Sequence, residues 1–295
     1  MRAFVFPGQG SQKIGMGKDL AESFPSAKAV FDEVDEALGE NFSALVFDGS
    51  DDDLKLTENT QPALMAVSLA AVRALEAEFG IALKDHGGFV AGHSLGEYSA
   101  LAAVGALSIA DTAKLLRLRG KAMQSAVPVG EGAMAAVLGL SMEQVEAVLA
   151  EADSSLGVAE VANDNANGQV VISGSAAAIT AAGEAMKAAG AKRAVPLPVS
   201  APFHCSLMQP AADAMAEALA SAAISAPALP VVANVLAASY DDPAQTAELL
   251  VQQVTGRVRW RESVEWMAAN GVTELVELGA GAVLGRSEEH TSELQ

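Results

Sequence analysis

The sequence predicts an α/β fold in which a larger three-layer domain, built on a parallel sheet, carries a smaller inserted ferredoxin-like (βαββαβ) subdomain. The chain has 295 residues and is 51% hydrophobic, which is enough to bury a large core. Short strand-like runs alternate with stretches of helical periodicity, as is typical of α/β proteins. After residue 130 this order changes to strand, helix, strand, strand, helix, strand, which is the order of a ferredoxin-like unit.

The larger domain begins with RAFVFP, a predicted buried strand that leads into the glycine-rich loop PGQGSQKIGMG. Helical periodicity follows over 25–38 and again from about Thr60 to Phe79, where Pro62 suits the first turn of a helix. GGFVAGHS predicts a strand and a turn, and a helix capped by Ser108 runs to about residue 126. LPVVANV and VTELVELG are expected to add later strands to the same sheet.

The inserted unit is bounded by the Pro/Gly-bearing stretches VPVGEG and PLPVSAP. Its expected elements are, in order, GAMAAVLGL, SMEQVEAVLAEA, GVAEVAN, GQVVISG, SAAAITAAGEAMKAAG and KRAVPLPV. We therefore assign residues 130–198 to the subdomain and residues 1–129 with 199–285 to a discontinuous larger domain.

The last ten residues, 286–295, read RSEEHTSELQ and are abruptly polar after the glycine turn of VELGAGAVLG. They resemble the translation of a sequencing-adapter oligonucleotide, so we interpret them as non-native and exclude them from functional reasoning. A genuine acidic tail is the alternative, and resequencing the locus would distinguish the two.

Composition excludes several classes of function. Eighteen basic against 37 acidic residues give a formal net charge of −19, which repels polyanions, so no nucleic acid is expected as a partner. Charges interrupt every apolar run before the roughly 18 residues that a membrane span needs, so no membrane partner is expected. The amino terminus lacks the apolar stretch of a secretory signal, which favours the cytoplasm. A single cysteine, Cys205, and the absence of Cys/His clusters predict no metal site.

GHSLGEYSA contains the pattern G-x-S-x-G between a predicted strand and a predicted helix. Hydrolases use this sharp turn, the nucleophile elbow, to expose a serine, which here is Ser94. A serine hydroxyl needs a base, most often histidine. His86 lies in a charged loop, His290 lies in the excluded tail, and His93 is adjacent to the serine, from which it should diverge. By elimination, His204 in PVSAPFHCSLM is the expected base.

The tetrahedral intermediate needs two hydrogen-bond donors. The elbow supplies the backbone N–H of Leu95, the residue after the nucleophile. The loop PGQGSQ is a candidate for the second donor, with Gln9 the residue expected to point its amide inward. This loop fits neither a dinucleotide-binding pattern nor a phosphate loop, which would need lysine where Met16 stands.

Several segments in this order resemble the bacterial malonyl-CoA:acyl carrier protein transacylases: VFPGQGSQ, TQPAL, GHSLGEYSAL, RGKAMQ, GAMAAVLGL, GQVVISG, AKRAVPLPVSAPFHCSLM and ELGAG. The resemblance covers residues 1 to about 285 and implies a hydrolase-like α/β domain that carries a ferredoxin-like subdomain. The chain departs from the family pattern at Ala282 and Asn167, where lysine and proline are common.

The resemblance also implies roles for individual residues. It makes Ser94 the nucleophile and His204 the base, and it places the backbone amides of Gln9 and Leu95 in the oxyanion hole. Arg119, in RLRGKAMQ, would bind the free carboxylate of a malonyl group, a task that suits the planar, permanently charged guanidinium. The main-chain carbonyl of Gln253 would hold His204, in place of a triad carboxylate.

The implied reaction is ping-pong: Ser94 takes the malonyl group from malonyl-CoA, and the phosphopantetheine thiol of acyl carrier protein then accepts it. The expected function is supply of fatty acid biosynthesis by a monomer that needs no dissociable cofactor, because malonyl-CoA and the carrier protein are substrates. A malonyltransferase of polyketide synthesis and a serine esterase or thioesterase remain alternatives, as does a non-catalytic interaction module. Local basic clusters would have to attract the acidic carrier, and the candidates are Lys114, Arg117 and Lys121, then Lys192 and Arg193, then Arg257, Arg259 and Arg261.

Overall fold

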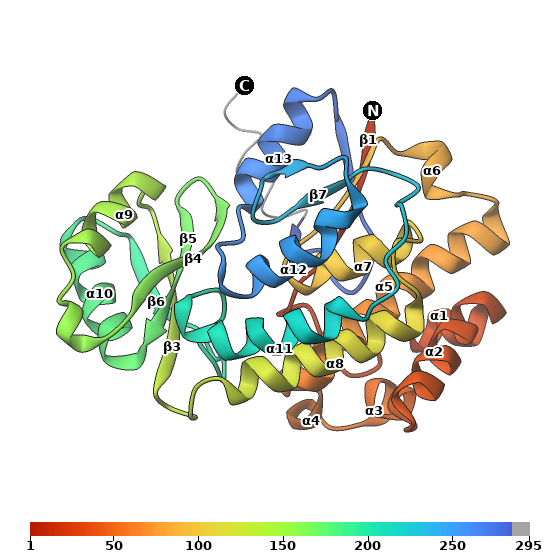
Figure 1. Ribbon diagram of the computed structural model, residues 1–295, viewed down its shortest axis with the longest axis horizontal. Helices are drawn as coiled ribbons and strands as arrows, with labels where there is room; N and C mark the ends of the chain where they lie inside the picture. The colour runs from red at the N-terminus through yellow and green to blue at the C-terminus, as the bar shows by residue number, and fades with distance from the viewer. Residues whose placement is uncertain (285–295) are drawn as a thin grey trace.

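The computed structural model describes residues 1–284 (Figure 1). The segment 286–295, which we interpreted as non-native, and its residue His290 lie outside the described residues. Within residues 1–284 the structure has α/β architecture with two separate sheets. None of the helices in this part of the chain is long and apolar enough to cross a membrane.

The first sheet has five strands in the order β8-β7-β2-β1-β9. Strands β1, β2, β7 and β9 pair in parallel, as the sequence predicts. The sheet as a whole is mixed, however, because β8 runs antiparallel to β7. The chain turns back tightly after β7, where Ala237 has φ 54° and donates its N–H to the Ala233 carbonyl at 2.9 Å. The strands span Arg2–Phe6 (β1), Phe89–Gly92 (β2), Val231–Ala233 (β7), Ala238–Ser239 (β8) and Glu274–Glu277 (β9).

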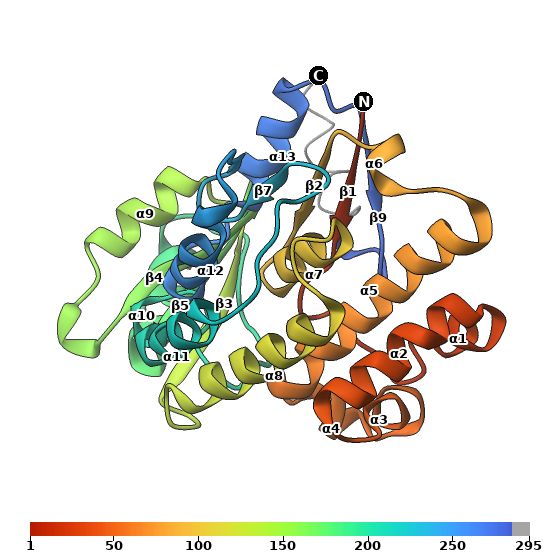
Figure 2. The same cartoon turned by 45° about the vertical axis from the view of Figure 1, so that its right-hand side comes forward.

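Side chains of β1 alternate between two apolar clusters, which shows that this sheet is buried on both faces. Phe4 and Phe6 belong to a large cluster shared with helices α2 (Pro25–Leu38), α5 (Thr57–Phe79), α7 (Leu95–Ala103) and α8 (Ile109–Ser125). Ala3 and Val5 belong to a smaller cluster with Trp260 and other residues of α13 and its neighbours. The sheet thus lies between helical layers, with α7 and α5 on one side of it and α13 on the other (Figure 2).

The helices before β2 contribute many residues to the larger cluster, and one of these helices differs from prediction. Helix α5 starts at Thr57, so Pro62 lies inside it rather than in its first turn. The extra turn is anchored by side chains, because Asn59 and Thr60 donate to the carbonyls of Asp53 and Leu54 at 2.8 and 2.6 Å. The helices span Lys18–Ser23 (α1), Pro25–Leu38 (α2), Phe42–Asp48 (α3), Asp51–Lys55 (α4), Thr57–Phe79 (α5) and Leu83–His86 (α6).

The remaining helices of the larger unit follow the elbow or the second sheet. Ser108 caps α8 as predicted, since its hydroxyl accepts from the Asp111 N–H at 3.0 Å. The bounds are Leu95–Ala103 (α7), Ile109–Ser125 (α8), Gln209–Ala220 (α11), Thr246–Thr255 (α12) and Trp260–Ala269 (α13), with short 3₁₀ turns at Ser206–Met208 and Pro243–Gln245. A third 3₁₀ turn, Ser154–Leu156, lies in the segment of the second sheet.

The second sheet has four antiparallel strands in the order β4-β5-β3-β6, packed against α9 and α10. All of its strands fall between residues 132 and 196, and the strands of the first sheet lie on either side of this range in sequence. It forms a separate lobe of the molecule (Figure 1). Its elements are Gly132–Leu138 (β3), Met142–Ala150 (α9), Ala159–Ala166 (β4), Gln169–Ser175 (β5), Ala176–Ala188 (α10) and Arg193–Pro196 (β6).

The edge strand β4 joins this lobe to the rest of the chain. A backbone bridge links it to the segment before α13: Val258 donates to the Ala162 carbonyl at 2.8 Å, and Asp164 donates to the Val258 carbonyl at 2.9 Å. The Asp164 carboxylate, whose side chain is 1% exposed, also pairs with Arg261 of α13 at 2.7 Å. The two lobes are therefore fixed to each other at this edge of the second sheet.

Candidate active site

Ser94 stands between β2 and α7 in a sharp backbone turn. Its φ of 54° and ψ of −113° lie in a region that non-glycine residues rarely occupy. The turn requires the flanking glycines, because a Cβ at Gly92 would lie 1.9 Å from the Gly96 carbonyl and a Cβ at Gly96 would lie 2.3 Å from the Phe6 carbonyl oxygen. The sequence G-x-S-x-G thus places the hydroxyl at the end of a buried strand and at the amino end of a helix.

Side chains from two other elements hold the Ser94 peptide. Asn234, which follows β7, accepts from the Ser94 N–H through Oδ1 at 2.7 Å and donates to the Gly92 carbonyl at 2.7 Å. Gln253 of α12 donates to the Ser94 carbonyl at 3.0 Å. The unusual backbone conformation is therefore bound on both its N–H and its C=O side.

His204 lies beside the serine as the sequence predicts. Its Nε2 is 2.8 Å from Ser94 Oγ, and its Nδ1 is 2.9 Å from the Gln253 carbonyl and 3.1 Å from the Gly256 carbonyl. Because both partners of Nδ1 are acceptors, we assign the ring proton to Nδ1, which leaves Nε2 free to accept from the hydroxyl. Burial, and after it the charge of Arg119, lowers the pKa of His204 to about 3. The ring is therefore neutral at ordinary pH and can act as a base.

Arg119 of α8 is 1% exposed and reaches the serine from the other side. Its Nη2 donates to Ser94 Oγ at 3.2 Å and to Gln253 Oε1 at 2.9 Å, and its Nη1 donates to Gln61 Oε1 at 2.8 Å. These protein contacts are neutral, and in residues 1–284 the guanidinium has no direct carboxylate partner and its buried Nε has no hydrogen-bond partner. A buried cation without a hydrogen-bonded counter-ion is costly, so this group is suited to an anionic ligand.

Gly120 explains how α8 brings Arg119 this close. A Cβ at this position would lie 2.5 Å from the Cα of Glu58 and 2.6 Å from the Thr57 carbonyl oxygen. Only glycine lets α8 approach the first turn of α5 so closely. One turn further along α5 is Gln61, whose side chain accepts from the guanidinium.

A cavity of about 630 Å³ opens onto Ser94, Arg119 and His204. Gln9 and Leu95 also line it, and Leu95 is the first residue of α7, where a backbone N–H has no partner within the helix. The loop of Gln9 lies against the elbow, since a Cβ at Gly8 would lie 2.8 Å from the His93 carbonyl oxygen. The role of these two amides as an oxyanion hole stays a prediction, which their position on the cavity wall supports.

The structure brings five predicted residues into one network or onto one wall of the cavity: Ser94, His204, Arg119, Gln9 and Leu95. Gln253 contacts Ser94 and Arg119 through its side chain and His204 through its carbonyl. The other histidines differ: His93 Nε2 is 2.9 Å from Asn165 Oδ1, and His86 is exposed at the end of α6.

Reasoning from the sequence gave no role to Gln61, Asn234 or Glu97. Glu97 is 1% exposed, and its Oε2 accepts from the Asn234 N–H and from Gln253 Nε2. Burial raises the pKa of Glu97 to about 7. Only its position three residues after Ser94 in GHSLGEYSA could have drawn attention to it.

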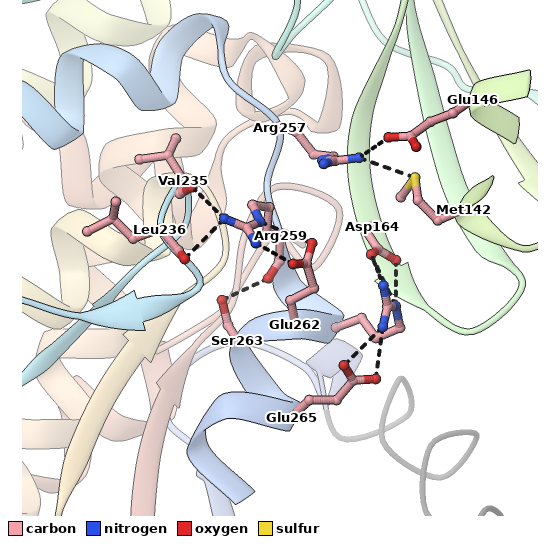
Figure 3. Close-up of polar contacts among 11 residues, drawn as sticks. Met142, Glu146, Asp164, Val235, Leu236, Arg257, Arg259, Glu262, Ser263 and Glu265 are labelled. Carbon is pink, nitrogen blue, oxygen red and sulfur yellow. Dashed lines mark hydrogen bonds and ion pairs between the residues drawn. The ribbon is translucent and has the colours of Figure 1, made fainter. Parts of the chain in front are cut away.

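The arginines after α12, a candidate docking cluster, are engaged within the chain (Figure 3). Arg257 pairs with Glu146 at 2.8 Å, Arg259 pairs with Glu262, and Arg261 bonds Asp164 and Glu265. Arg117 of the first cluster likewise pairs with Glu40. Of the candidate docking cations, Lys114, Lys121, Lys192 and Arg193 are exposed and have no ion pair within residues 1–284, so these four remain available to a partner.

Three or more His, Cys, Asp or Glu side chains do not gather anywhere in residues 1–284 in a way that could hold a metal ion. Cys205 is a buried free thiol whose Sγ contacts the Pro202 carbonyl at 3.1 Å.

Comparison with known proteins gives consistent results. A family model described as "Acyl transferase domain" matches residues 3–294. The malonyl CoA-acyl carrier protein transacylase of Bacillus subtilis is 47% identical over 282 residues, which cover 96% of this chain and 87% of that protein.

Two solved structures are similar over nearly the whole chain. The acyl-carrier-protein-S-malonyltransferase of Bartonella henselae is 55% identical with a TM-score of 0.95, over 98% of this chain and 91% of that one. A malonyl-transacylase in complex with its type II PKS acyl-carrier protein is 43% identical with a TM-score of 0.94, over 99% of this chain and 93% of that one.

Proposed function

This chain belongs to the acyl transferase domain family. We propose that it transfers the malonyl group of malonyl-CoA to the phosphopantetheine thiol of acyl carrier protein, in support of fatty acid synthesis. The observation that carries the proposal is the buried guanidinium of Arg119, which has no carboxylate partner in residues 1–284 and contacts the nucleophile. The relatives' names supply the acyl donor and the carrier, and Arg119 supplies a reason for that donor.

The size of the malonyl group fits this arrangement. In a malonyl-serine ester only three covalent bonds separate Oγ from the carboxylate carbon, a span of about 4 Å at standard bond lengths. A guanidinium whose Nη2 lies 3.2 Å from Oγ is within reach of that carboxylate. A neutral acetyl group would leave the cation uncompensated, so the site favours an acyl group that ends in a short carboxylate.

The first half-reaction acylates the enzyme. Ser94 Oγ passes its proton to Nε2 of His204 as it attacks the thioester carbon, and the Gln253 and Gly256 carbonyls stabilise the imidazolium that forms. The backbone amides of Gln9 and Leu95 would stabilise the oxyanion. The C–S bond then breaks, and the CoA thiolate takes the proton from His204.

The second half-reaction reverses these steps with another thiol. His204 takes the proton of the carrier's phosphopantetheine thiol, the thiolate attacks the malonyl-serine ester, and Ser94 leaves with the proton. The groups that react belong to the protein and its two substrates, and we propose that no dissociable cofactor takes part. We further propose that the protein acts as a monomer in the cytoplasm.

We interpret the larger unit as a hydrolase-like domain and residues 130–198 as a ferredoxin-like subdomain. The element order β3-α9-β4-β5-α10-β6 and the sheet order β4-β5-β3-β6 support this interpretation. The subdomain closes one side of the cleft, since Met134 and Asn163 line the same cavity as Ser94.

A carrier of polyketide synthesis is a second candidate acceptor, because one similar structure holds a type II PKS acyl-carrier protein. Malonyl transfer to the two kinds of carrier, measured with the same enzyme preparation, distinguishes them by kcat/KM.

Malonyl transfer from CoA to carrier protein, measured beside hydrolysis of malonyl-CoA and of a neutral ester, tests the proposal. Transfer that exceeds both hydrolyses supports it. Hydrolysis that exceeds transfer would make the protein an esterase or thioesterase instead.

A further inference from the structure

Glu97 is a buried carboxyl in the first turn of α7 to which the proposed reaction assigns no step. One of its oxygens, Oε2, accepts two hydrogen bonds, from the Asn234 N–H at 3.1 Å and from Gln253 Nε2 at 2.7 Å. These donors come from distant parts of the chain, one directly after β7 and the other in α12. A single oxygen therefore fixes the relative positions of two elements beside the nucleophile.

Each donor also holds one side of the Ser94 peptide. Asn234 Oδ1 accepts from the Ser94 N–H, and Gln253 Nε2 donates to the Ser94 carbonyl. A non-glycine residue with φ 54° and ψ −113° persists only where its surroundings hold it. The contacts that hold Ser94 meet at Glu97.

Glu97 also sets the direction of the Gln253 amide. The Nε2 end faces two acceptors, the Glu97 carboxyl and the Ser94 carbonyl, so it must be the donor end. Its Oε1 end is consequently turned to Arg119, from which it accepts at 2.9 Å. A reversed amide would point N–H groups at the guanidinium, which has only donors.

We propose that Glu97 is a positioning residue of the transfer reaction. Its Oε2 fixes Asn234 and Gln253, which hold the Ser94 peptide. It also orients the Gln253 amide, whose oxygen accepts from Arg119. The inference rests on the proposed function, in which Arg119 binds the malonyl carboxylate. Because the pKa of Glu97 is raised by burial, its role depends on the position of an acceptor oxygen, which a neutral carboxyl retains, more than on full negative charge.

Two conservative variants separate position from charge. Glu97→Gln keeps an oxygen at the same reach and removes the charge, whereas Glu97→Asp keeps the charge and withdraws the oxygen by about 1.5 Å. Acylation by malonyl-CoA and by acetyl-CoA is measured in single turnovers. We expect Glu97→Gln to acylate within about tenfold of wild type, and Glu97→Asp to lose about 100-fold with malonyl-CoA, since an error near 1 Å costs about that much. The preference for malonyl over acetyl should fall in Glu97→Asp as well.

Asp164→Asn is the matched control, because Asp164 is another carboxylate that is 1% exposed but contacts Arg261 and not the Ser94 network. It should lower the melting temperature and leave the acyl preference unchanged. A Glu97→Asp variant that acylates like wild type, or a Glu97→Gln variant slower than Glu97→Asp, overturns the proposal. A loss confined to the melting temperature, as in the control, also overturns it.

Sulfonylation of Ser94 by phenylmethanesulfonyl fluoride provides a readout that needs no malonyl group. The Oγ–S bond forms, the S–F bond breaks, and the hydroxyl proton leaves with fluoride. The same order, wild type and Glu97→Gln ahead of Glu97→Asp, is expected here. If the wild-type protein fails to transfer malonyl groups, the proposed function is contradicted. The role of Glu97 is still tested in that case, by the order in which the variants are sulfonylated.

Discussion

Arg119 Nη2 lies 3.2 Å from Ser94 Oγ, so the buried cation and the proposed nucleophile of this protein are in direct contact. The same guanidinium is held at two other points by the amide oxygens of Gln61 and Gln253. The site thus fixes a positive charge where, by the proposed function, the far end of a short acyl group would lie. Under the proposed function, one network both selects the acyl group and activates the serine.

Replacement of Ser94 by alanine should abolish the acyl-enzyme, because the hydroxyl is the group that forms the ester. We expect malonyl transfer to fall by at least about 10³-fold, and no malonyl adduct to form on the protein. Mass spectrometry after mixing with malonyl-CoA measures the adduct, with wild type as the positive control. An adduct of the same mass on Ser94→Ala would assign the nucleophile to another residue.

Replacement of Arg119 by alanine should change which acyl group is preferred. Loss of one partner of a buried charge pair costs about 2–5 kcal/mol, so malonyl transfer should fall by about 30-fold to several thousandfold. Acetyl transfer should fall less, because the acetyl group has no carboxylate to bind. The ratio of kcat/KM for malonyl-CoA and acetyl-CoA measures the change, and a ratio equal to that of wild type would exclude Arg119 as the carboxylate-binding group.

The acid limb of the pH profile should report His204. Its pKa is lowered by burial and by the nearby charge of Arg119, so wild type should keep its kcat/KM well below pH 6.5. Arg119→Gln removes one of these causes, so the acid limb should move to higher pH. Acetyl-CoA is the appropriate substrate, since it has no carboxylate for Arg119 to bind. A limb that stays in place or moves to lower pH contradicts the assignment, and recovery of activity on return to neutral pH controls for unfolding.

Gly8→Ala should push the loop of Gln9 away from the elbow. The added methyl group would lie 2.8 Å from the His93 carbonyl oxygen and 2.9 Å from its Nδ1, which is too close. If Gln9 supplies an oxyanion donor, kcat should fall by about 10- to 100-fold while KM changes little. Gly183→Ala within α10 is the control: its added methyl group would lie 3.7 Å from the nearest atom outside its helix, the Ala194 Cβ of β6, so it should be neutral or stabilising. Equal kinetics for the two variants would remove Gln9 from the proposed oxyanion hole.

Glu97 should make stability depend on pH in a defined direction. Its pKa is about 7 in the folded protein against 4.5 as a model value, so its contribution is complete below pH 4.5 and is lost as pH rises through 7. Glu97→Gln lacks this loss and should gain about 3 kcal/mol relative to wild type between those limits. Urea unfolding of both proteins from pH 4 to pH 8 measures the difference in unfolding free energy. His204 has a lowered pKa and changes stability with pH in the opposite direction, but it is present in both proteins, so its contribution cancels in the difference. A difference that does not vary with pH would contradict the raised pKa.

Much of this architecture could be predicted from the sequence because its signals are local. The pattern G-x-S-x-G, the cap at Ser108 and the periodicity over Pro25–Leu38 each depend on neighbouring residues, and each lies where predicted. The order of elements from Gly132 to Pro196 was also readable, because strand and helix alternate there with clear breaks.

What could not be predicted depends on contacts between distant residues. Asn234 and Glu97 act on Ser94 only because β7 and α7 meet in space, and nothing within either segment indicates this. The true start of α5 depends on hydrogen bonds from the Asn59 and Thr60 side chains to α4, which extend the helix by a turn. Helical periodicity does not reveal these bonds, so the sequence predicts Pro62 in the first turn. The three arginines after α12 suggest a docking surface in sequence, but their carboxylate partners lie in α9, β4 and α13.

The backbone strain at the site bears on how this protein tolerates mutation. Among residues 1–284, Ser94, His204 and Ala237 are the non-glycine residues with positive φ, and two of the three are the proposed nucleophile and base. Each such conformation costs about 1–3 kcal/mol, against a total stability of roughly 5–15 kcal/mol for a typical protein. A chain that keeps both has little reserve for further destabilising changes, so its sequence should drift slowly in the core that surrounds the elbow. Stabilising the scaffold elsewhere would widen the set of variants that still fold around an intact Ser94.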